Sequence, residues 1–124
     1  MEIKIKRVVD YISKWEKNDK SDNPITFKLK YLTAAESDDC YSISPLQLDV
    51  RGKKVAGGAI TVDRGKMFLY AVVEILNLTT IDENGKKTKI KTGEDLLKSP
   101  GLEDLYFEVI AFVKGMDARL DVKN

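Results

Sequence analysis

Alternating apolar and polar residues predict one strand in the first third of the chain. Its apolar positions are Ile25, Phe27, Leu29 and Tyr31, with Thr26, Lys28 and Lys30 between them. A period of two residues is typical of a strand that buries one face. The polar residues 16–24 before it predict a turn-rich loop.

The opening residues 3–15 are compatible with both a strand and a helix. Ile3 and Ile5 alternate with charged residues, as they would in a strand. A helical stripe is also present, and it consists of Ile5, Val8, Val9, Ile12 and Trp15. The pattern alone leaves both structures open for this segment.

A capping box predicts a helix directly after the strand. Thr33 and Glu36 have the required spacing, in which the Thr hydroxyl accepts the N3 amide and the Glu carboxylate reaches back to the N-cap amide. This helix is expected to run to about Tyr41 and to be broken by Ser44-Pro45.

The C-terminal third predicts two further helices. Thr92 begins a short one with acidic residues in its first turn, and Ser99-Pro100 supplies an N-cap and a first-turn proline for a closing helix. The apolar stripe of the closing helix consists of Leu102, Leu105, Tyr106, Val109, Ile110, Val113 and Met116. Phe107 falls outside this stripe, so it either plugs a neighbouring loop or contacts a partner. Residues 117–124 are expected to be a frayed tail.

Apolar runs and turn signals predict the remaining elements. Residues 65–77 are apolar nearly all round, which favours a buried central helix. Asn84-Gly85 predicts a two-residue hairpin turn that sets Glu83 opposite Lys86 and Asp82 opposite Lys87. Residues 44–64 are expected to form a short hairpin or a mobile loop. Together these elements predict an α+β fold in a single domain 1–124, with a small antiparallel sheet and hairpins packed against two to four helices.

The length and the scarcity of histidine and cysteine narrow the function classes. The chain has 124 residues, a single-domain length, with no histidine and one cysteine. These counts exclude Ser-His-Asp and Cys-His catalytic groups, His-ligated metal sites, Cys-cluster zinc sites and an internal disulfide. Neither Gly-Lys pair has the upstream glycine and following Ser or Thr of a phosphate-binding loop. We therefore predict a protein that is not an enzyme, with no catalytic, cofactor-binding or metal-binding residues.

The formal net charge of +1 is the sum of six alternating charged blocks. Such blocks suit a solvated surface or lateral self-association. The basic block 51–66 contains Arg51, Lys53, Lys54, Arg64 and Lys66, which could hold a phosphate backbone. No aromatic residue interleaves with them to stack on bases, so nucleic acid is a disfavoured partner. The expected partner-binding residues are Tyr106, Phe107 and Phe112 of the closing helix, together with Arg51, Lys53 and Lys54.

Sequence signals for export or membrane insertion are missing. Lysines interrupt the apolar pairs of the first residues, unlike the unbroken apolar segment of a signal peptide. The most apolar stretch, Met67 to Leu78, contains Glu74 and is far shorter than the roughly 20 residues of a membrane span. We therefore expect a cytoplasmic protein without a membrane partner.

Two stretches, residues 8–36 and 72–113, carry a series of short motifs in a characteristic order. The motifs are Leu32-Thr33-Ala34-Ala35-Glu36, Asn77-Leu78, Asp82-Glu83-Asn84-Gly85-Lys86 and Leu96-Leu97-Lys98-Ser99-Pro100. In this order they resemble small proteins of the tail-assembly-chaperone type, which are encoded in the tail modules of tailed phages and prophages. Residues 52–66 do not fit that pattern.

The resemblance implies a non-enzymatic helper in phage tail morphogenesis. Such chaperones bind the long, largely helical tape-measure protein in the cytoplasm of the bacterial host and leave as tail-tube subunits polymerise. The implied partners are therefore the tape-measure protein or other tail proteins, with a homo-oligomer as a further expectation. Two alternatives stay open: a structural neck or tail-completion component of the virion, and a small nucleic-acid-binding regulator that acts through residues 51–66.

Overall fold

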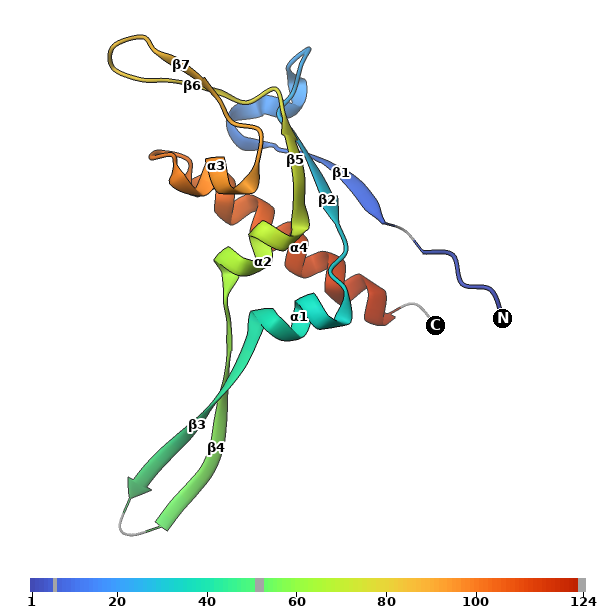
Figure 1. The fold of residues 1–124 in the computed structure, drawn as a ribbon, viewed down its shortest axis with the longest axis vertical. Helices are drawn as coiled ribbons and strands as arrows, with labels where there is room; N and C mark the ends of the chain where they lie inside the picture. The colour runs from blue at the N-terminus through green and yellow to red at the C-terminus, as the bar shows by residue number, and fades with distance from the viewer. Residues whose placement is uncertain (6, 51–52, 123–124) are drawn as a thin grey trace.

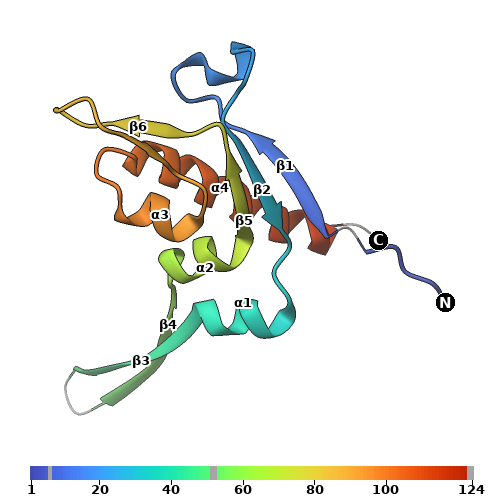
Figure 2. The same cartoon turned by 45° about the horizontal axis from the view of Figure 1, so that its top comes forward.

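The computed structural model describes the backbone of residues 1–5, 7–50 and 53–122, and the side chains of residues 1–5, 7–42 and 60–116. A three-stranded antiparallel sheet in the order β1-β2-β5 consists of β1 (Val8–Ile12), β2 (Thr26–Lys30) and β5 (Val72–Leu76). The α-helices of the described residues are α1 (Ala34–Cys40), α2 (Arg64–Ala71), α3 (Gly93–Lys98) and α4 (Glu103–Val122). Helix α4 crosses behind the sheet (Figures 1 and 2). The predicted α+β fold is confirmed.

The core lies between one face of the sheet and the helices. Its fully buried side chains include Phe27 and Leu29 of β2, Met67 and Phe68 of α2, and Leu105 and Val109 of α4. The alternation in β2 places Phe27 and Leu29 on this inner face, while Lys28 and Lys30 remain partly exposed. The predicted strand and the apolar stripe of the closing helix are therefore both confirmed.

The opening segment contains a strand, which settles the alternative left open by its pattern. β1 pairs antiparallel with β2, from Val8 opposite Lys30 to Ile12 opposite Thr26. A 3-10 turn (Trp15–Lys20) and a loop connect the two strands. The side chain of Asn18 closes this connection, because its Nδ2 donates to the Ser13 carbonyl at 2.7 Å and its Oδ1 accepts from the Ile25 amide at 2.7 Å.

The carboxylate of Glu108 fastens the end of β1 to α4. It accepts hydrogen bonds from the Tyr11 hydroxyl at 2.5 Å, the Ser13 hydroxyl at 2.7 Å and the Lys14 amide at 2.9 Å. Ser13 is completely buried. Burial and then the hydrogen bond to Glu108 raise the pKa of Tyr11, so the phenol remains the donor at neutral pH. This one carboxylate therefore joins residues from opposite ends of the chain.

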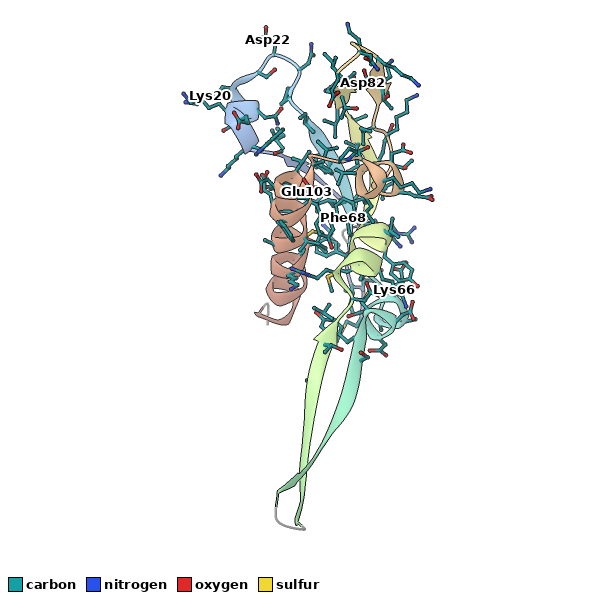
Figure 3. The ribbon with its side chains drawn as sticks, turned by 90° about the vertical axis from the view of Figure 1, so that its left-hand side faces the viewer. Lys20, Asp22, Lys66, Phe68, Asp82 and Glu103 are labelled. Atoms are coloured by element: carbon teal, nitrogen blue, oxygen red, sulfur yellow. The ribbon has the colours of Figure 1, made fainter. Side chains whose placement is uncertain are left out.

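Helix α1 leads into a long hairpin of β3 (Tyr41–Val50) and β4 (Lys53–Val62). The predicted capping box is present, because the Glu36 amide donates to Thr33 Oγ1 at 3.1 Å and the Thr33 amide donates to Glu36 Oε1 at 3.0 Å. The two strands pair antiparallel at ten positions and project from the body of the molecule (Figures 1 and 3). The prediction for residues 44–64 thus identified a hairpin as one option and underestimated its length.

The base of this hairpin is held by contacts between α1 and α2. The Asp63 amide donates to the Cys40 carbonyl at 2.7 Å. The Asp39 carboxylate accepts from the Tyr70 hydroxyl at 2.6 Å and from the Lys66 ammonium at 3.4 Å. These contacts secure both strands where they leave the body.

The prediction of one helix over residues 65–77 is wrong. Helix α2 ends at Ala71, and β5 begins at the next residue and pairs with β2. An apolar run of this kind fits a buried helix and a buried strand equally well, so its hydrophobicity does not show where one ends. The β-branched residues Val72, Val73 and Ile75 favour the strand.

The hairpin of β6 (Thr79–Ile81) and β7 (Lys87–Lys89) is present, but its predicted register is wrong. Ile81 lies opposite Lys87, one position away from the expected partner. The turn has three residues, because the Asp82 amide donates to the Lys86 carbonyl at 3.0 Å and Gly85 adopts a φ of 80°. The Asp82 carboxylate stabilises this turn by accepting from the amides of Asn84 and Lys86.

Ser99-Pro100 closes α3 and does not begin α4. The Ser99 hydroxyl donates to the Asp95 carbonyl at 2.8 Å, and Gly101 makes the turn with a φ of 85°. Helix α4 then begins at Glu103 and continues to Val122, so most of the expected frayed tail is helical, and residues 123–124 lie outside the described residues. The predicted helix start at Thr92 is confirmed by a second capping box.

We expect Glu108→Ala to lower the free energy of unfolding by about 2 kcal/mol or more, because it removes the acceptor of a buried hydroxyl and a phenol. Asp104→Ala, on an exposed residue of the same helix, should cost less than about 1 kcal/mol. Urea denaturation followed by circular dichroism measures both. Equal effects of the two substitutions would contradict the importance of the Glu108 contacts.

The contacts of Asp39 predict a pH-dependent stability. The hydrogen bond from Tyr70, and then that from Lys66, hold the pKa of the Asp39 carboxyl below its ordinary value of 3.8. Its contribution is therefore complete above that value and is lost as the pH falls through the lower pKa of the folded state. Denaturation between about pH 5 and pH 2 should show a shallower loss of stability for Asp39→Asn. Asp38→Asn, in the same helix, should keep the wild-type slope.

Candidate functional site

An exposed aromatic surface lies where α4 meets α2 and α3. Phe107 is 48% exposed on α4, and the Arg64 guanidinium carbon lies 5.5 Å from the centroid of its ring. The Tyr106 ring lies 5.4 Å from Phe107 and contacts the buried Phe68 edge-on at 5.1 Å. Burial raises the pKa of Tyr106. We call Arg64, Leu97, Tyr106 and Phe107 the Phe107 surface.

A small hollow of about 130 Å³ opens between α3 and α4 beside this surface. It is lined by Leu96, Leu97, Ser99, Leu102, Glu103 and Tyr106. Leu97 is 40% exposed at its rim. Three leucines line one part of the hollow and the polar side chains of Ser99, Glu103 and Tyr106 line the rest, so it suits one small side chain from another protein. The Phe107 surface thus combines exposed aromatic area, a guanidinium and a place for one anchoring side chain.

Phe112 does not belong to this surface. Five residues along an α-helix correspond to a rotation of about 140°, so Phe112 and Phe107 leave α4 in different directions. The ring of Phe112 stacks on Tyr11 of β1, with 4.3 Å between the ring centroids. Of the three aromatic residues expected to bind a partner, the structure therefore brings together only Tyr106 and Phe107.

The basic segment is divided between the two ends of the hairpin. Lys53 and Lys54 begin β4 at the end far from the body, and Arg51 lies outside the described residues. Arg64 and Lys66 belong to α2, after a strand whose ten residues span about 30 Å. Lys66 contacts Asp39, and Arg64 contacts the Phe107 ring. Among the described positions, Lys53 and Lys54 therefore lie far from Arg64 and Lys66, and these four residues do not share one phosphate-binding surface.

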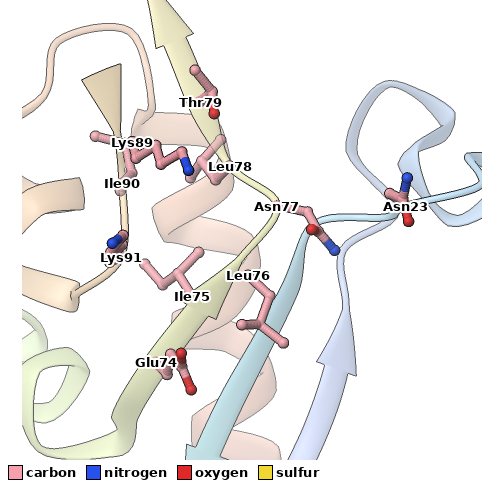
Figure 4. Close-up of a pocket in the computed structure, with 10 residues that line it drawn as sticks. All are labelled: Asn23, Glu74, Ile75, Leu76, Asn77, Leu78, Thr79, Lys89, Ile90 and Lys91. Atoms are coloured by element: carbon pink, nitrogen blue, oxygen red, sulfur yellow. The ribbon is translucent and has the colours of Figure 1, made fainter. Parts of the chain in front are cut away.

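Two larger hollows lie on other parts of the molecule. One of about 460 Å³ lies between β5 and residues 89–91, at the end of β7. Lys89 and Lys91 lie on one side of it, and Asn23 and Asn77 lie on the other (Figure 4). The other, of about 520 Å³, lies at the beginning of β1. It is lined by Ile5, Arg7, Val8, Lys30, Tyr31, Leu32, Thr33 and Val73. The sequence prediction missed this apolar hollow, since it required the pairing of β1 with β2.

The described side chains include no group of three or more Cys, Asp or Glu that could hold a metal ion. None of the helices in the described part of the chain is long and apolar enough to span a membrane. Comparisons of the chain with protein-family models, with curated proteins and with solved structures each found no significant match.

The different environments of the two phenylalanines predict different effects on stability. Phe107→Ala should lower the free energy of unfolding by less than about 1 kcal/mol, because the ring is half-exposed. Phe112→Ala should cost about 2 kcal/mol or more, because it removes a ring stacked on Tyr11 and partly buried area. Urea denaturation of both variants checks the ranking. A larger cost for Phe107→Ala would show that this ring is part of the core.

Proposed function

We propose that this protein is a non-enzymatic tail-morphogenesis protein that binds the tape-measure protein of a tailed phage and keeps its helical segments soluble during assembly. The motif order in residues 8–36 and 72–113 supports the class. The observation that carries the proposal is the Phe107 surface, where a 48% exposed aromatic ring lies next to Tyr106, which lines a small hollow between α3 and α4.

The physical requirements of such a chaperone are modest. An amphipathic helix presents apolar residues three and four positions apart, and one of these can enter a hollow while its neighbours cover an adjacent aromatic ring. The hollow of about 130 Å³ and Phe107 offer these two contacts side by side. Arg64 adds a cation that favours acidic residues on the polar side of the bound helix. A small surface of this kind binds weakly, and many copies along one long partner raise the overall affinity.

The proposal predicts that co-expression rescues the tape-measure protein encoded in the same tail module. Wild-type chaperone should raise the soluble fraction of that protein and co-purify with it. Phe107→Ala should reduce co-purification at least about fivefold, since exposed aromatic anchors at interfaces contribute 1 kcal/mol or more. Quantitative gel analysis of the soluble and bound fractions measures both effects.

Ile81→Ala provides the matched control. Ile81 is 65% exposed on the separate β6–β7 hairpin, so its truncation also removes exposed apolar area. It should leave co-purification at the wild-type level. Absence of any complex with the wild-type chain would contradict the proposed function, and equal losses for both variants would contradict the assignment to the Phe107 surface.

A structural virion component is the alternative that one observation favours. The β3–β4 hairpin projects about 30 Å from the body, a length suited to contact with a neighbouring subunit in a permanent assembly. Mass spectrometry of purified mature particles separates the two functions. A chaperone should be missing from those particles, whereas a neck or tail-completion component should be present in a fixed ratio to the tail-tube subunit.

A further inference from the structure

The outer edge of β1 has no strand beside it in the described part of the chain. β2 is the neighbour of β1 in the sheet order β1-β2-β5. The Ser13 amide donates to the Ile25 carbonyl at 3.2 Å, which places the hydrogen bonds to β2 on the odd-numbered residues of β1. In antiparallel pairing the backbone groups of the alternate residues Val8, Asp10 and Ile12 therefore point outward. They offer donors and acceptors to a further strand.

The hollow of about 520 Å³ opens at the beginning of the same edge. Its apolar walls include Val8, Leu32 and Val73. This volume is larger than any one apolar side chain, and it is typical of pockets that enclose a ligand. The hollow therefore accommodates a bulky apolar side chain together with the end of the chain that carries it.

Two cations line this hollow, and they differ in their partners. The Lys30 ammonium contacts the Glu36 carboxylate at 2.6 Å. Arg7 has no carboxylate within ion-pair distance among the described side chains. An unpaired guanidinium beside apolar walls favours a ligand with one carboxylate on an apolar body, because the guanidinium fork matches the two carboxylate oxygens.

We propose that this edge binds the C-terminal segment of another protein as an added strand that runs antiparallel to β1. In this direction the last residue of the segment lies opposite Val8. Its carboxylate accepts from the outward-pointing Val8 amide and meets the Arg7 guanidinium. A parallel segment would end at the opposite end of β1, far from both Arg7 and the hollow.

The side chains of β1 determine which residues the segment carries. Cross-strand neighbours share one face of a sheet, and Val8 and its neighbour Lys30 both line the hollow, so a residue opposite Val8 directs its side chain there too. Asp10 has no ion pair with another described side chain, and Ile12 is 45% exposed. The matching segment therefore has an apolar last residue, Lys or Arg two positions earlier, and an apolar residue four positions from the end.

These features select a chain end over other occupants. An internal segment of a protein would place a neutral peptide bond beside Arg7. A nucleic acid would set its phosphates against Asp10, and a free aliphatic acid would leave the edge of β1 unpaired. This inference does not depend on the proposed function, since it concerns β1 and not the Phe107 surface.

Fluorescence anisotropy with a synthetic peptide tests the carboxylate contact. The probe is Ser-Val-Thr-Lys-Thr-Leu, with fluorescein on its amino terminus and a free carboxylate. It should bind the full chain saturably, and the same peptide with a C-terminal amide should bind roughly tenfold or more weakly because the ion pair with Arg7 is lost. Arg7→Gln should remove this difference, whereas Lys4→Gln, on an exposed cation of the same segment, should preserve it.

Three results of these titrations would overturn the proposal. The first is a lack of saturable binding up to about 1 mM peptide. The second is equal binding of the acid and the amide to the wild type. The third is decanoate that displaces the probe as effectively as the unlabelled peptide, because the site would then hold a free aliphatic acid without strand pairing.

Amide hydrogen exchange, measured by NMR, tests the strand pairing. Saturation with the peptide should slow exchange of the outward-pointing amides of Val8, Asp10 and Ile12. The amides of Val9 and Tyr11 face β2, so their exchange should change little. Unchanged exchange at the three outward-pointing amides would refute the added strand.

A charge exchange tests the register. The peptide with Glu in place of Lys should bind the wild type about threefold or more weakly than the Lys peptide, and Asp10→Lys should reverse this preference. Asp10 lies opposite Lys28, so circular dichroism verifies that the variant folds. Asp19→Lys makes the same change on the exposed turn after β1 and should retain the preference of the wild type. Equal affinity of the two peptides for the wild type would contradict the register.

Discussion

The carboxylate of Glu108 is the contact on which the arrangement of the body depends. It lies on the last helix and accepts three hydrogen bonds from the segment that ends the first strand, at sequence separations of 94 to 97 residues. The sheet supplies one wall of the core and α4 supplies the other, and this carboxylate sets how the two walls meet. The Tyr11–Phe112 stack beside it adds apolar area to the same junction.

Local signals in the sequence predicted the elements that local chemistry determines. The sequence predicted the capping boxes at Thr33 and Thr92, the strand around Phe27 and the apolar stripe of the closing helix, because each depends on residues that are close in sequence. The end of α2 at Ala71 could not be predicted, since a buried helix and a buried strand have the same hydrophobic composition. The hairpin register at Ile81 depended on how the Asp82 carboxylate binds the turn, which composition does not reveal.

The candidate surfaces were predictable only in part for a related reason. Phe107 could be recognised from the sequence because it falls outside a helical stripe, whereas its contact with Arg64 joins two helices far apart in the chain. The division of the basic segment follows from the ten-residue strands of the hairpin, which the glycine-rich sequence concealed. The hollow beside β1 needs three strands to be assembled before its walls exist.

The β3–β4 hairpin and the body form their contacts at very different distances along the chain. All pairings within the hairpin join residues that are close in sequence, from Val50 with Lys53 to Tyr41 with Val62, whereas the β1–α4 junction requires nearly the whole chain. Closing short loops is fast and joining distant segments is slow. During synthesis the hairpin can therefore form before α4 has left the ribosome, and the hydrogen bonds that join the end of β1 to α4 form only after Glu108 has emerged.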